Sequence, residues 1–135
     1  MSALRAFHWP RLWVGLWVLM IAAVVTGSLV PSDELPRMLF PGADKLQHMA
    51  GYATLSGYAV MLFADRRGRG MAAVGLVLLG VLIEGAQSAL TTSRQADPMD
   101  MLANLLGVGL GQALAATGIA GWLLRIDSRL AAGRR

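Results

Sequence analysis

The sequence predicts an all-α membrane protein, a four-transmembrane-helix bundle with both termini in the cytoplasm. Its 135 residues are 56% hydrophobic and only 15% charged, with a mean hydropathy of +0.55. Soluble domains carry about a quarter charged residues. The apolar residues form four runs, each long enough to cross a ~30 Å hydrocarbon layer as a helix. Basic residues gather at the ends of these runs, which gives the bundle a direction.

The first expected helix covers about residues 12–30. It follows Arg5 and Arg11, and Pro31 ends it. A secretory signal peptide has a similar layout, but this run is longer than the usual apolar centre and no A-x-A cleavage site follows, so a retained helix is expected. Three tryptophans near its start are expected to anchor at the lipid headgroups: Trp9, Trp13 and Trp17.

Two further helices are expected at about 46–64 and 71–90. Polar residues interrupt the first of these, so one side of it should face protein. Asp44, three residues before Gln47, has the spacing of a helix cap. The 71–90 run is apolar until Glu84, a carboxylate that needs a partner or a proton inside a membrane.

The fourth helix is expected at about 99–124. Asp97 followed by Pro98 is typical of a helix start. Gly107 and Gly111 are expected to let a neighbouring helix approach closely. The basic tail after this run is expected to be a frayed amphipathic end on the membrane surface. No second domain or internal repeat is expected, so residues 1–135 form one domain.

The basic residues predict the orientation. Four spans place nine of them on one side and only Arg37, Lys45 and Arg94 on the other. Because the side richer in Lys and Arg is cytoplasmic, the connections at 31–45 and 91–97 are expected outside. The predicted location is the cell inner (plasma) membrane. The nine are Arg5, Arg11, Arg66, Arg67, Arg69, Arg125, Arg129, Arg134 and Arg135.

With this topology, three helices bring their polar groups to one depth near the outer surface. Helical spacing places Glu84 and Gln87 on one face, and Asp97, Asp100 and Asn104 on another. We therefore expect one outward-facing site. Its expected ligand-binding residues are Asp44, Lys45, Gln87, Arg94, Asp97 and Asn104; His48, Glu84 and Asp100 are the expected catalytic residues if the protein is an enzyme.

These residues resemble the VanZ-like family of small polytopic membrane proteins. The similar motifs are Asp44-Lys45-x-x-His48-x-x-x-Tyr52, then Glu84-x-x-Gln87, then Arg94-x-x-Asp97-x-x-Asp100-x-x-x-Asn104-x-x-Gly107-x-x-x-Gly111. The chain departs from the family's pattern at Met49, where Phe is common, and at Thr92-Ser93, where Pro-Gly is common. The founding member is associated with resistance to teicoplanin, which acts on cell-wall precursors outside the membrane. The resemblance implies a polytopic protein with an outward-facing polar site.

Three functions fit these observations. In the first, Lys45, Arg94 and the amides at a helix start bind an anionic lipid or lipid-linked cell-envelope precursor headgroup. In the second, the protein is an intramembrane enzyme in which His48 and Glu84 act as acid and base on a phosphoryl or acyl group stabilised by Arg94. In the third, the polar groups only fix helix packing.

The expected partner is therefore a membrane lipid or a lipid-linked precursor, and a homo-oligomer is left open. A nucleic-acid partner is not expected, because the basic residues flank apolar runs and form no basic surface. No cofactor and no metal are expected. A divalent ion held by His48, Glu84, Asp97 and Asp100 is kept as a minor alternative, since N and O ligands suit such ions.

Overall fold

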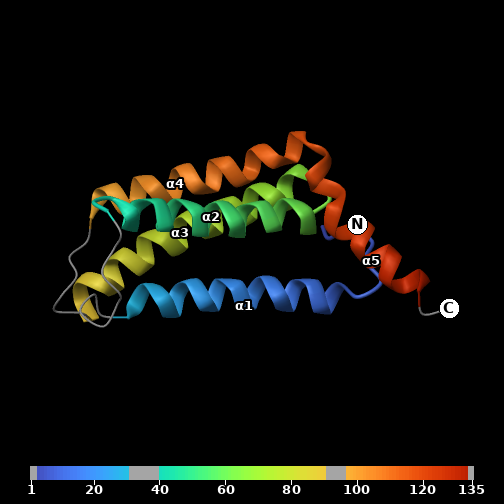
Figure 1. The fold of residues 1–135 in the computed structure, drawn as a ribbon, viewed down its shortest axis with the longest axis horizontal. Coiled ribbons are helices and arrows are strands. Elements are labelled where there is room, and N and C mark those ends of the chain that lie inside the picture. The colour runs from blue at the N-terminus through green and yellow to red at the C-terminus, as the bar shows by residue number, and fades with distance from the viewer. Residues whose placement is uncertain (1–2, 31–39, 91–96, 134–135) are drawn as a thin grey trace.

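The computed structural model describes residues 3–30, 40–90 and 97–133, and the regular structure within these ranges is helical, with no strand. Figure 1 shows the long helices running along the long axis of the molecule, with α2 and α4 adjacent and the shorter α5 at one end. The helices are α1 (Pro10–Leu29), α2 (Ala43–Leu62), α3 (Arg66–Leu90), α4 (Pro98–Ala113) and α5 (Trp122–Ala132), with short 3₁₀ turns η2 (Leu114–Ala116) and η3 (Gly118–Gly121) between α4 and α5.

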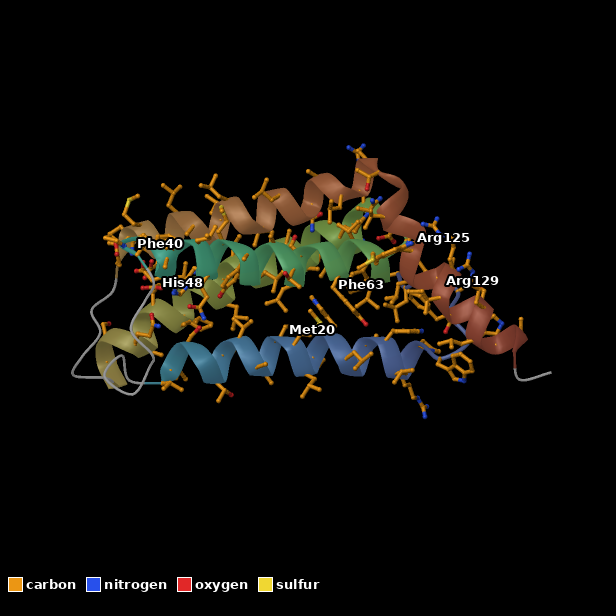
Figure 2. The ribbon with its side chains drawn as sticks, viewed as in Figure 1. Met20, Phe40, His48, Phe63, Arg125 and Arg129 are labelled. Atoms are coloured by element: carbon orange, nitrogen blue, oxygen red, sulfur yellow. The ribbon has the colours of Figure 1, made fainter. Side chains whose placement is uncertain are left out.

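The two ends of the bundle differ in what they carry. One end holds the start of α1, the α2–α3 connection and α5, with Arg125 and Arg129 (Figure 2). The other end holds the end of α1, the starts of α2 and α4, and His48 (Figures 1 and 2). The predicted polar site and the C-terminal basic residues therefore lie at opposite ends of the helices.

Within the described parts of the chain, three helices are long and apolar enough to cross a membrane: Pro10–Leu29, Arg66–Ala89 and Pro98–Ala116. Their outward faces carry exposed large apolar side chains, such as Leu19 and Leu82. Exposure of such apolar faces to water costs free energy, whereas exposure to hydrocarbon does not. The surface is therefore consistent with a membrane protein. α2 is of similar length but is more polar, because it supplies one wall of the polar site.

α2 packs most extensively against α4, and glycines make that contact close. A Cβ atom on Gly107 would collide with the backbone oxygen of Met49, and one on Gly111 would lie 2.5 Å from Ser56 Cβ. The predicted packing role of both glycines is thus confirmed. Ser56 Oγ donates to Val108 O at 2.9 Å and accepts from Gln112 Nε2 at 3.0 Å, which adds polar contacts to this apolar interface.

The prediction of one continuous fourth helix over 99–124 is wrong. α4 ends at Ala113, and the chain turns through η2 and η3 before α5 begins. Thr117 is extended, with φ −114° and ψ 166°, and its hydroxyl both donates to Leu114 O and accepts from Ile119 N–H. Short hydroxyl side chains compete with helical hydrogen bonds in this way. Thr117 is thus the C-cap of η2 and the N-cap of η3.

The C-terminal tail is also not frayed over its described part, because α5 is anchored through Asp127. This carboxylate is fully buried. It accepts hydrogen bonds from His8 N–H at 2.7 Å, His8 Nδ1 at 2.8 Å, Trp9 N–H at 3.2 Å and Trp13 Nε1 at 2.8 Å. α5 is therefore tied to the start of α1.

The expectation that the tryptophans anchor at the headgroups is wrong for Trp13, which is buried and bonded to Asp127. Trp17 is partly buried, and its Nε1 donates to Leu55 O at 3.0 Å. Both indole N–H groups thus find an acceptor inside the protein. These rings hold α1 to the rest of the bundle at its N-terminal half.

Candidate functional site

The outermost part of the site is an ion cluster around Lys45. Its ammonium lies 2.8 Å from Asp44 Oδ2, 2.7 Å from Asp97 Oδ2 and 2.9 Å from Asp100 Oδ1. The cluster joins the start of α2 to the start of α4. One positive charge faces three carboxylates, so all three of its N–H donors have acceptors within the protein.

Local sequence explains why both helices begin here. Gly42 is the N-cap of α2 with φ +85°, a left-handed conformation that suits glycine. Asp44 is therefore inside the first turn, and the prediction that it caps α2 is wrong. Asp97 does cap α4, since its Oδ1 accepts from Met99 N–H at 2.8 Å. The Lys45 ammonium, followed by this Met99 hydrogen bond, lowers the pKa of the Asp97 carboxyl.

His48 lies one turn further into α2 and faces α4. Its Nδ1 is 3.2 Å from Asn104 Oδ1, and its Nε2 is 3.8 Å from Asp100 Oδ2. An amide oxygen only accepts, so this hydrogen bond places a proton on Nδ1. In the neutral ring, the Nε2 lone pair then faces a carboxylate oxygen.

Glu84 is the third wall of the site, and its side chain is buried, with 2% exposure. Its Oε2 accepts from Asp97 N–H at 3.2 Å, which links α3 to the residue that caps α4. Its Oε1 is buried with no hydrogen-bond partner among the described residues. Glu84, His48 and Asp100 each offer a ligand atom, and these atoms lie within 4.8 Å of one another.

Two more polar atoms behind this cluster are buried without a partner in the described part of the chain: Tyr52 Oη and Asn104 Nδ2. Both lie beside Gly80 of α3, where an added Cβ would be 3.3 Å from the first and 3.1 Å from the second. Burial of an unpaired polar group costs roughly 1–3 kcal/mol. Buried polar groups in native structures are usually paired with protein, water or an ion, so Glu84 Oε1, Tyr52 Oη and Asn104 Nδ2 mark positions where a further partner could bind.

An apolar groove between α3 and α4 adjoins these atoms. Its first part, about 250 Å³, is lined by Gly80, Asn104 and five apolar side chains. A second cavity of about 310 Å³ shares Val77 and Leu105 with it and continues along the same two helices. The groove therefore runs from the polar site along α3 and α4 toward the middle of their length. Asn104 lies where the groove meets the polar site.

The structure places most of the predicted site residues together. One connected group at the end of the bundle contains most of them: Asp44, Lys45, His48, Glu84, Asp97, Asp100 and Asn104. Gln87 is also buried, but its Nε2 donates to Ser28 O of α1 at 2.7 Å, so it ties α3 to α1. Arg94 lies outside the described residues.

Tyr52 and Gly80 also lie at this site, although neither was among the expected ligand-binding or catalytic residues; Tyr52 appeared only in the motif that resembles the VanZ-like family. Tyr52 lies four residues after His48, and this helical spacing places both on one face, so a signal was present. Gly80 sits within an apolar run and carries no signal of its own. Tyr58, whose Oη donates to Trp13 O at 3.2 Å, belongs to the opposite end of the bundle.

Comparisons of this chain with family models, with curated proteins and with solved structures find no match.

Proposed function

We propose that this chain is a VanZ-like protein of the inner (plasma) membrane whose site binds the polar headgroup of an anionic lipid or lipid-linked cell-envelope precursor. One observation carries the proposal: unpartnered buried polar atoms lie where an apolar groove meets a polar cluster. A ligand with a polar head and an apolar chain would pair with the unpartnered polar atoms through its head and fill the apolar groove with its chain.

Asn104 is the residue at which head and chain would separate. Its side-chain oxygen is engaged by His48, and its Nδ2 donor has no partner among the described residues. A phosphate oxygen of a headgroup would accept from this Nδ2 and from Tyr52 Oη. The apolar chain would lie along Val77 and Leu105 between α3 and α4, two residues shared by both parts of the groove.

The role of Lys45 changes in this proposal. Its ammonium is held by Asp44, Asp97 and Asp100, so it organises the mouth of the site rather than offering a free charge to the ligand. Recognition of an anion by the described residues therefore rests on the neutral donors. Arg94, in the connection between α3 and α4, is proposed as the additional cation.

The proposal includes the topology. α2 is proposed as the fourth membrane span, with its more polar side against α4. The basic residues at the α5 end favour a cytoplasmic position for that end, and the polar site is accordingly proposed to lie at the outer surface. A cell-wall precursor exposed there is the substrate class that the VanZ resemblance implies, and an effect on teicoplanin resistance is part of the proposal.

Replacement of Asn104 by leucine tests this function. We expect binding of a polyprenyl phosphate to the detergent-purified protein, measured by native mass spectrometry, to weaken at least tenfold, since a lost hydrogen bond to a charged group costs about 1.5–3 kcal/mol. Gln112→Leu is the matched control, because it makes a similar change on α4 away from the site. Equal binding by both variants and the original protein would refute the proposed contact.

The approach of His48, Glu84 and Asp100 favours a second candidate, an intramembrane enzyme acting on a lipid phosphoryl or acyl group. A histidine and a neighbouring carboxylate are suitable as a general acid and a general base. In this case, incubation of the protein with membrane lipids is expected to yield a product seen by lipid mass spectrometry. That product should disappear in His48→Ala and in Glu84→Gln; its persistence in both variants would exclude these residues as catalysts.

A further inference from the structure

The charges of the described site do not balance. Asp44, Asp97 and Asp100 share the single Lys45 ammonium, and Glu84 lies behind them with one hydrogen bond, from a backbone N–H. Among the described residues of this site, four carboxylates thus meet one permanent cation. Asp44 and Asp97 remain 44% and 39% exposed, but Asp100 is only 15% and Glu84 only 2% exposed. Carboxylates removed from water in this way are costly unless an opposite charge compensates them.

We propose that His48, Glu84 and Asp100 bind a divalent metal ion. Each residue offers a ligand atom, and the three atoms lie within 4.8 Å of one another. His48 Nε2 and Asp100 Oδ2 are 3.8 Å apart. Two ligands on one first-row ion, each about 2.0–2.2 Å from it, are at most about 4.4 Å apart, so this pair already fits and the third ligand needs only a small adjustment.

The unpartnered oxygen of Glu84 is an independent observation that points to the same ligand. The side chain is 2% exposed, and Oε1 has no donor in the described structure. The second oxygen of each of the two carboxylates already has a partner. Asp100 uses its other oxygen for Lys45, and Glu84 uses its other oxygen for Asp97 N–H.

The hydrogen bond between His48 and Asn104 completes the argument. Metal-bound histidines usually donate their second ring N–H to an oxygen, which fixes the ring and leaves the other nitrogen for the ion. Here Nδ1 faces Asn104 Oδ1 at 3.2 Å, and Nε2 faces the carboxylates. An imidazole with two carboxylates suits Zn²⁺ or Mn²⁺ better than Ca²⁺, which prefers oxygen ligands alone.

This site goes beyond the proposed headgroup binding and does not depend on it. Three protein ligands leave coordination positions open, and a phosphate oxygen is one group that an ion can take there. The ion would add positive charge next to Asn104 and Tyr52, where the described residues offer only neutral donors. A metal-binding assay without lipid therefore distinguishes failure of the metal site from failure of lipid binding.

The test is isothermal titration of the EDTA-treated full chain in detergent with Zn²⁺, and separately with Mn²⁺. We expect saturable binding of one ion per chain, weakened tenfold or more in His48→Ala and in Glu84→Gln. His8→Ala is the matched control, since His8 is the other histidine of the chain and lies at the opposite end. Its affinity should equal that of the original protein.

Two measurements keep the result interpretable. Circular dichroism and size-exclusion chromatography confirm that each variant is folded, and Asp100→Asn replaces Glu84→Gln if that variant does not fold. Absence of saturable binding by the original protein would overturn the proposal. Unchanged affinity in the folded site variants, or an equal loss in His8→Ala, would also overturn it by placing the ion elsewhere.

Discussion

Replacement of Asp127 by alanine is expected to lower the free energy of unfolding by about 1.5–3 kcal/mol, the range for loss of hydrogen bonds to a buried charged group. The carboxylate is fully buried and accepts from four donors, and the variant leaves the Trp13 indole N–H without an acceptor. Denaturation by SDS in mixed micelles, followed by tryptophan fluorescence, measures the loss, and Trp13 reports directly on the broken contact.

Asp65→Ala is the matched control for this prediction. Asp65 lies at the same end of the bundle but is exposed, and its Oδ1 accepts a single hydrogen bond from Gly68 N–H. We expect a loss of about 1 kcal/mol there, as for a helix cap. Similar losses in the two variants would show that Asp127 does not anchor α5.

The Asp127 contact also predicts a pH dependence. Burial acts to raise the pKa of this carboxyl, but hydrogen bonds from His8 N–H, the Trp13 indole, the His8 ring and Trp9 N–H outweigh it and lower the pKa from 3.8 to about 2. A carboxyl whose pKa is lowered in the folded state stabilises the fold at pH values above its pKa in the unfolded state. This contribution is lost as the pH falls from about 4 through 2. The difference in stability between the original protein and Asp127→Ala should shrink over this interval.

Gly107→Ala is expected to lower the free energy of unfolding by about 3 kcal/mol, at the upper end of the range for overpacking, because the obstacle is backbone. The new methyl group would collide with Met49 O and lie 3.1 Å from Ala53 N. α2 and α4 would have to separate, which would also widen the distance between His48 and Asn104. Thermal unfolding in detergent and the headgroup-binding assay should both show the effect.

Gly109→Ala is the control, two residues further along the same helix. A Cβ there meets nothing within 4 Å, and alanine favours a helix over glycine by up to about 1 kcal/mol. That variant should be as stable as the original protein or more so. Equal stability of Gly107→Ala and the original protein would show that α2 and α4 do not pack at the distance described.

The all-helical character of the chain was predictable because its signals are local. Apolar runs and their polar ends are read directly from the sequence, and α1, α2 and α3 overlap most of the expected ranges 12–30, 46–64 and 71–90, although each begins earlier and the first two also end earlier. The break after Ala113 was not predicted, since the residues around it are as apolar as those in the helix. Thr117 and Gly118 are the only local signal, and a single Thr-Gly pair also occurs within membrane helices.

The site was predictable to the extent that spacing and depth bring residues together. The expected topology placed Glu84 and Asn104 at one depth. In the structure, Glu84 accepts from Asp97 N–H and Asn104 contacts His48, and the Lys45 ion cluster connects these two contacts. The pairing of Lys45 with three carboxylates was not predictable, because it depends on side-chain rotamers at two helix starts. Asp127 was missed because its four donors are more than one hundred positions away in the chain.

The separation of His8 and Asp127 has a consequence for how the protein is made. These residues are 119 positions apart, so the ribosome delivers the start of α1 long before the carboxylate that accepts its N–H groups. During synthesis, the Trp13 indole lacks its final acceptor until α5 has been made. A nascent chain that stops before α5 therefore lacks the contact that ties α5 to the start of α1.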